Sequence, residues 1–113
     1  MATKAYELLD SQEAVAPSLF WFEIRNVLIT NERTGRIDAE QTQRGLALLA
    51  ALPIRLDHAA NEATTLRLAR QHRLAVYDAS YLDLALRLSV AVATADRAMA
   101  KAARAENIPL IGG

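Results

Sequence analysis

Short apolar stretches alternate along this chain with longer segments in which apolar residues recur at helical spacing. The stretches at 14–16, 54–56, 91–93 and 109–111 have the length and composition of short strands. Between them, apolar residues fall three or four positions apart, as they do in amphipathic helices. Because neighbouring parallel strands are joined by a crossover that is usually a helix, this alternation predicts an α/β domain. We expect a mostly parallel sheet with helices on both faces.

Capping residues and helix breakers place the expected helices more closely. Pro17 and Ser18 open a helix that runs to about Arg33, because proline is tolerated in a first helical turn. Asp38 and Gln41 have the spacing of a capping box, in which each side chain accepts a hydrogen bond from the other residue's backbone amide. Further helices are expected over 59–72, from 78 onward and over 97–106, and residues 3–10 look like the end of a helix.

Size and composition exclude several classes of protein. The 113 residues are enough for one domain, 1–113, and too few for two. The chain has no cysteine, which excludes disulfides and thiolate metal sites and fits a cytoplasmic protein. No apolar run reaches the roughly 18 residues of a membrane helix. Thirteen basic residues balance thirteen acidic ones, so any contact with nucleic acid must come from a local patch.

Three acidic residues occupy positions where apolar neighbours surround them. Glu23 lies within the run Leu19–Ile24, Asp78 follows an apolar stretch that ends at Tyr77, and Asp96 ends the strand-like segment 90–95. A carboxylate among apolar groups is costly unless a positive charge meets it. Three such carboxylates at element boundaries or on buried faces suggest one shared cation.

Each acid also has a purely structural interpretation. Aspartate is a preferred helix N-cap, and for Asp78 or Asp96 taken alone a cap is the stronger interpretation. Glu23 could instead carry its charged end out to solvent along the side of its helix. Caps would explain two helix starts, but they would not explain Glu23.

Polar neighbours of the acids indicate which cation would suit them. Asn26 follows Glu23 by three positions on a helix, and Thr94 precedes Asp96 by two on an extended chain, so each polar residue shares a side with its acid. Oxygen ligands of this kind suit Mg²⁺ or Mn²⁺ rather than zinc. A divalent ion held by carboxylates can activate water at a phosphate, so the pattern indicates phosphodiester hydrolysis.

The ordered motifs resemble the PIN-domain ribonucleases of the VapC toxin type. The resemblance extends from Ala14 to the C-terminus, and its carriers are the segments 16–17, 23–28, 77–85, 93–97 and 108–110. Glu23 and Asn26 match a Glu-x-x-Asn helix, Asp78 matches the acid of a Tyr-Asp motif, and Asp96 matches the acid that follows a late strand. Each motif alone is weak, and the ordered set is fairly specific.

The resemblance implies a fold, an activity and partners. It implies a three-layer domain and a Mg²⁺- or Mn²⁺-dependent endoribonuclease that cleaves single-stranded RNA and pairs with a cognate antitoxin, with a homodimer as the expected assembly. Glu23, Asp78 and Asp96 would be the catalytic metal ligands, and Asn26 and Thr94 would line the site. Family members begin with a central strand that ends in an aspartate. We expect that strand to be missing here, since Asp10 has no strand before it, and activity could suffer from the loss.

Other residues have weaker claims to function. Arg97 and Lys101 share a helix face that could follow an RNA backbone, although a solvated face is the simpler interpretation. Arg25 could bind RNA or pair with an acid, and an outward Trp21 would suit a dimer or antitoxin contact. We expect surface positions for His58 and His72, and an ordinary surface ion pair between Asp83 and Arg87.

Two other functional classes compete with a nuclease. The first is a non-catalytic PIN remnant that only dimerises or binds an antitoxin. The second is a phosphoacceptor signalling domain, which is also Mg²⁺-dependent and doubly wound. That class needs adjacent acids after its first strand and a lysine after a late strand, and this chain has neither.

Overall fold

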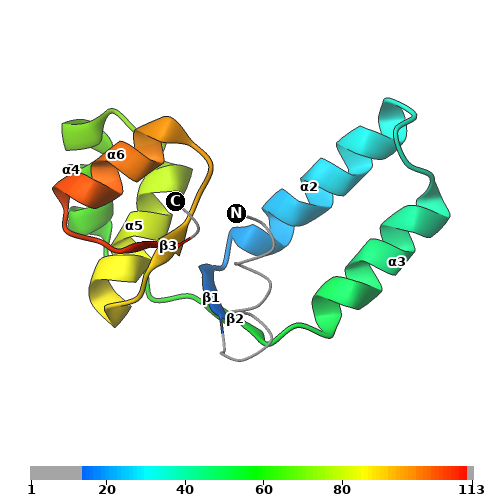
Figure 1. Ribbon diagram of the computed structural model, residues 1–113, viewed down its shortest axis with the longest axis horizontal. Coiled ribbons are helices and arrows are strands. Elements are labelled where there is room, and N and C mark those ends of the chain that lie inside the picture. Colours follow the sequence, from blue (N-terminus) through cyan, green and yellow to red (C-terminus); the bar gives the residue numbers. More distant parts are fainter. Residues whose placement is uncertain (1–13, 112–113) are drawn as a thin grey trace.

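The computed structural model describes residues 14–111, and the expected helix end at 3–10 and Asp10 lie outside them. The described chain alternates strands and helices as expected (Figure 1). In chain order the elements are β1 (Ala14–Pro17), α2 (Phe20–Arg33), α3 (Ala39–Ala50), β2 (Ile54–Asp57), α4 (Glu62–His72), α5 (Val76–Leu88), β3 (Val92–Ala93), α6 (Arg97–Ala105) and β4 (Leu110–Ile111). The α/β prediction is confirmed.

The strands form two separate parallel pairs rather than one continuous sheet. Ala14 to Pro17 pair in register with Ile54 to Asp57, and the two residues of β3 pair with β4. No strand described between 14 and 111 joins the two pairs. Helix α5 contacts both β1 and β3, so one helix packs against both halves. The strand expected at 14–16 has a hydrogen-bonded neighbour on one side, in β2.

Helix starts differ from the sequence expectation where tertiary contacts intervene. Pro17 extends β1 opposite Asp57, so α2 begins at Phe20 after a turn rather than at Pro17 and Ser18. Asn61 caps α4 by accepting a hydrogen bond from the amide of Thr64, which delays that helix until Glu62. Helix α5 begins earlier than expected, at Val76, and its N-cap residue Ala75 makes no side-chain capping bond.

The hydrophobic core lies in the C-terminal half of the chain. It is made by α4, α5, β3, α6 and the turn before β4, with Leu68, Leu82 and Ala103 fully buried. Full burial of one leucine side chain contributes roughly 1.5–3 kcal/mol to the stability of the fold. This cluster therefore fixes α5, the helix that carries Asp78, against its neighbours. No residue of α2 is buried, and α3 buries only Thr42.

Helices α2 and α3 form a hairpin arm that extends away from this core (Figure 1). The radius of gyration is 14.8 Å, against about 13 Å for a compact domain of this length. The arm exposes the large apolar side chains Trp21, Phe22, Val27, Ile29 and Leu48. Apolar patches of this kind usually mark a binding surface.

The capping box at the start of α3 is formed as expected and provides a stability test. The Asp38 carboxylate accepts from the Gln41 amide at 2.7 Å, and the Gln41 side chain accepts from the Asp38 amide at 3.0 Å. We expect Asp38→Ala to destabilise α3 by about 1 kcal/mol, because the Gln41 amide hydrogen loses its acceptor. Helix content by circular dichroism during urea titration measures this loss. Glu40→Ala, at an exposed position of the same helix, should change the stability of α3 by less than about 0.5 kcal/mol. Equal effects of the two substitutions would contradict the capping role of Asp38.

No helix within residues 14–111 is both long enough and apolar enough to cross a membrane.

Candidate functional site

Glu23 and Tyr81 meet across the junction between the arm and the core. Glu23 lies in the first turn of α2, just after the carboxyl end of β1, and Tyr81 lies in the middle of α5. The Tyr81 hydroxyl donates a hydrogen bond of 2.5 Å to Glu23 Oε1, and both side chains are partly buried. Glu23 Oε2 makes no hydrogen bond within the described part of the chain. Glu23 is therefore held by a specific partner rather than extended into solvent.

Asp78 lies one turn before Tyr81 on the same side of α5. Burial raises the pKa of Tyr81 above its usual range, and the hydrogen bond to Glu23 and the nearby charges of Glu23 and Asp78 raise it further. The Tyr81 hydroxyl is thus kept protonated as a donor between two acids. Asp78 does not cap α5, since the N-cap residue is Ala75. Among residues 14–111 its carboxylate makes no hydrogen bond or ion pair, so the capping interpretation of Asp78 is wrong.

Asp96 is the N-cap of α6, which is the structural role that its sequence position suggested. It follows β3 and caps α6, where its carboxylate accepts from the Met99 amide at 2.8 Å. The Thr94 hydroxyl accepts from the Asp96 amide at 3.1 Å, which fixes the turn between strand and helix. Only one Asp96 oxygen is used in the cap, and the residue is exposed.

The described residues do not assemble three acids into one metal-holding group. Within residues 14–111 no set of three or more His, Cys, Asp or Glu side chains is arranged to hold an ion. What the structure brings to Tyr81 is a pair of acids: Glu23 accepts its hydrogen bond, and Asp78 lies one helical turn before it, close enough for its charge to act on the phenol. The donor chemistry of that pair is hard oxygen, which suits Mg²⁺ or Mn²⁺.

The remaining candidates occupy more exposed positions. Asn26 lies exposed on α2, one turn after Glu23. Arg97 and Lys101 lie exposed on α6, four residues apart, so they share a face of that helix. Arg25 packs over the Trp21 ring at 3.8 Å from its centroid and donates to the Trp21 carbonyl at 3.0 Å. The Arg25 guanidinium is thus held by its own helix.

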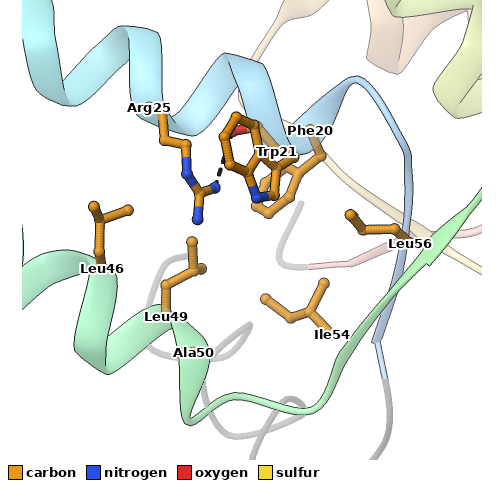
Figure 2. A pocket seen from close by; sticks show the side chains of 8 residues that line it. All are labelled: Phe20, Trp21, Arg25, Leu46, Leu49, Ala50, Ile54 and Leu56. Carbon is orange, nitrogen blue, oxygen red and sulfur yellow. Dashed lines mark hydrogen bonds between the residues drawn. The ribbon is translucent and has the colours of Figure 1, made fainter.

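A small apolar hollow of about 150 Å³ lies between α2, α3 and β2, at the base of the arm (Figure 2). Arg25 and Trp21 of α2 face Leu46 and Leu49 of α3 across it, and Ile54 of β2 contributes at its base. None of the acidic candidates lines this hollow. It belongs to the arm and not to the acidic site.

The sequence did not reveal the contact between Tyr81 and Glu23, and two expectations about surface positions are wrong. Tyr81 follows Asp78 by three residues, which is the helical spacing that places two side chains on one face. Asp83 is fully buried, so the expected surface pair with Arg87 is wrong. His72 is only 11% exposed and lies 2.7 Å from Glu106, so its expected surface position is wrong as well. His58 is exposed, as expected.

Comparison with known protein families identifies the family of this chain. Residues 1–105 match the PIN domain, which is most of the chain. The chain belongs to the PIN-domain family. None of the curated proteins matches it significantly. PIN domains are generally metal-dependent nucleases, and many are toxins, so the family agrees with the acidic pair on α2 and α5. The resemblance to PIN domains noted from the motifs is confirmed at the level of the family.

Proposed function

We propose that this PIN domain is a Mg²⁺- or Mn²⁺-dependent endoribonuclease of the VapC toxin type that cleaves single-stranded RNA. The observation that carries the proposal is Asp78, a carboxylate with no capping bond or ion pair within residues 14–111, which lies one helical turn before the tyrosine that binds Glu23. Within residues 14–111 the fold uses five acids as helix caps or ion-pair partners: Asp38, Asp57, Asp83, Asp96 and Glu106. The described residues give Asp78 neither role, so its carboxylate would be available to a metal ion.

The residues that would hold the ion are Glu23 and Asp78, which both lie by Tyr81, and Asp96, which the family resemblance adds and which residues 14–111 do not by themselves group with the other two. Glu23 and Asp96 each follow the carboxyl end of a strand, which is where α/β folds bind ligands. Asp96 can cap α6 with one oxygen and retain the other for a ligand. When bound, the ion would supply an activated water and neutralise charge that develops on the phosphate.

Other residues of this PIN domain would orient the reactants. Asn26, one turn after Glu23, would donate an amide hydrogen bond to a phosphate oxygen or a water, and Thr94 would hold the turn that presents Asp96. Arg97 and Lys101 would contact the RNA backbone, since single strands are bound largely through phosphates. Arg25 is a weaker candidate for RNA, because its guanidinium already packs on Trp21.

Metal binding can be tested by thermal unfolding. With Mn²⁺ at about a hundredfold excess over its Kd, ligand linkage should raise the melting temperature by about 10 °C. Asp78→Asn should abolish that shift and leave the melting temperature of the metal-free protein unchanged, because Asp78 makes no structural bond within residues 14–111. Asp96→Asn should also abolish it, while asparagine preserves the cap on α6.

RNA cleavage in the same samples provides the second measurement. Wild type should cut a single-stranded RNA in the presence of Mn²⁺, and Asp78→Asn should cut it at least a hundredfold more slowly. Asp38→Asn, which keeps a cap far from the acids, is the matched control and should match wild type in both assays. If wild type and Asp78→Asn respond alike to Mn²⁺, the metal site is wrong.

A non-catalytic binding role is the second candidate, and the exposed arm favours it. Phe22 is 70% exposed and Leu48 is 72% exposed, on two helices that bury almost nothing of their own. Such a surface would suit a second copy in a homodimer or the helix of a cognate antitoxin. Absence of cleavage and of a Mn²⁺ shift, together with a dimer that Phe22→Glu dissociates in ultracentrifugation, would favour this candidate over the nuclease.

A further inference from the structure

We propose that Tyr81 is a positioning residue that fixes the Glu23 carboxylate, so that Oε1 is occupied by the phenol and Oε2 remains available to a divalent cation. This inference rests on the metal-dependent function proposed above and adds to it a residue outside the expected ligand set. In this proposal Tyr81 would contact neither the ion nor the RNA, and it would act only through Glu23.

The contact itself is specific. The two residues are 58 positions apart in the chain, and the 2.5 Å bond from the Tyr81 hydroxyl to Glu23 Oε1 is the hydrogen bond that links α2 to α5 within residues 14–111. A glutamate has three rotatable side-chain bonds, so without a partner its carboxylate would sample many positions. One strong donor on one oxygen restricts both the location of the carboxylate and its orientation.

Tyr81 is anchored more firmly than Glu23, so the hydrogen bond should constrain Glu23 more than it constrains Tyr81. Tyr81 belongs to α5, which packs into the core through Ala79 and Leu82, both fully buried. Glu23 belongs to α2, in which no residue is buried. The rigid partner therefore orients the less constrained one. Partners that orient a metal ligand from outside the coordination shell typically change metal affinity by about 10- to 100-fold when they are removed.

Asp78 is the second acid close to Tyr81. It lies three residues before Tyr81 on the same helix, close enough for its charge to act on the phenol. The Tyr81 hydroxyl donates to Glu23 and not to Asp78, so the phenol constrains only the Glu23 carboxylate. Glu23 would present one oxygen to the ion, whereas both oxygens of Asp78 remain open.

Tyrosine-to-phenylalanine substitutions on α5 test the proposal with a matched control. Tyr81→Phe removes only the hydroxyl and keeps the ring. Tyr77→Phe makes the same chemical change one turn earlier, on a side chain that is 65% exposed. Mn²⁺ affinity, measured by calorimetry on the whole chain, should fall about tenfold in Tyr81→Phe. It should stay within about twofold of wild type in Tyr77→Phe.

The metal affinity separates positioning from simple stabilisation. A purely structural hydroxyl would lower the melting temperature of Tyr81→Phe and leave Mn²⁺ affinity unchanged, and that result would overturn the proposal. If Tyr81→Phe does not fold, Tyr81→Met serves instead, because its flexible apolar side chain can fill the same space and also lacks the hydroxyl. Its Mn²⁺ affinity should also fall about tenfold, and unchanged affinity would overturn the proposal in the same way.

The outcomes also distinguish this proposal from the function on which it rests. If wild type binds Mn²⁺ and Asp78→Asn does not, the metal site is supported. Equal Mn²⁺ affinity of wild type and Tyr81→Phe would then overturn only the positioning role of Tyr81. If wild type binds no Mn²⁺, the metal-dependent function fails and the positioning role fails with it.

Discussion

Replacing Arg87 with alanine is expected to cost about 3–5 kcal/mol of stability, because it leaves a buried carboxylate without its cation. Asp83 is fully buried, and its Oδ2 accepts from Arg87 Nε at 2.9 Å and from the Asn61 amide at 3.2 Å. Its Oδ1 has no hydrogen-bond partner in the described structure. Domains of this size are stable by only about 5–15 kcal/mol, so the variant should be close to unfolding.

Arg87 also ties α5 to the end of β2, which adds to the expected loss. Its Nη2 donates to Asp57 Oδ2 at 2.6 Å, and this hydrogen bond is the main reason why the pKa of Asp57 lies below its usual range. The same bond raises the pKa of Arg87, which remains charged throughout the ordinary pH range. The guanidinium thus bridges two carboxylates from different elements.

Urea unfolding of Arg87→Ala measures this cost, and two further variants interpret it. Arg70→Ala removes an exposed arginine from α4 and should change stability by less than about 0.5 kcal/mol. The double variant Arg87→Met with Asp83→Leu removes the buried charge as well as its partner, and it should recover most of the loss. A single-variant cost below about 1 kcal/mol would show that Asp83 is not held by Arg87 as the structure indicates.

Acidification should destabilise this PIN domain through Glu106. Its carboxylate accepts two hydrogen bonds from Arg67, at 3.0 and 3.1 Å, and lies 2.7 Å from His72. The Arg67 hydrogen bonds, and then that of His72, lower the pKa of Glu106 from 4.5 to about 2. Because the folded pKa is the lower one, this contribution is present above about pH 4.5 and is lost as the pH falls toward 2.

A pKa difference of that size corresponds to at most about 3 kcal/mol. The Arg67 side chain is 46% exposed, so solvent screening reduces the expected contribution to about 1–2 kcal/mol. Urea unfolding at pH 6 and at pH 3 should show wild type losing more stability than Glu106→Gln, since the variant has no carboxylate to protonate. Glu40→Gln removes an exposed carboxylate and should keep the wild-type pH dependence. If Glu106→Gln has the same acid sensitivity as wild type, the ion pair does not stabilise the fold.

The sequence predicted those parts of the fold that depend on neighbouring residues. The capping box of Asp38 and Gln41 forms as expected, because its geometry is fixed by a spacing of three residues in one helix. Asp96 caps α6 for the same reason. Pro17 went into a strand instead of a helix, because pairing with Asp57 outweighed the local preference.

The sequence could nominate the acids of the candidate site one by one, and they stay predictions, but it could not show which side chains meet them. Glu23 and Asp78 were recognisable because each is a costly acid among apolar neighbours. Which side chain would hold Glu23 was not, since Tyr81 comes from a helix whose approach to α2 depends on packing. Burial of Asp83 was equally hidden, because spacing reveals the ion pair with Arg87 but not the helix packing that covers it.

By itself, then, the sequence determined the α/β class, the caps of α3 and α6 and the candidate acids, because these follow from periodicity and from the chemistry of adjacent residues. Only the tertiary structure decided that Tyr81 binds Glu23, that Asp78 is free of capping duties and that Arg87 bridges two carboxylates. Those contacts join residues far apart in the chain, and their geometry depends on how whole helices pack rather than on any local pattern.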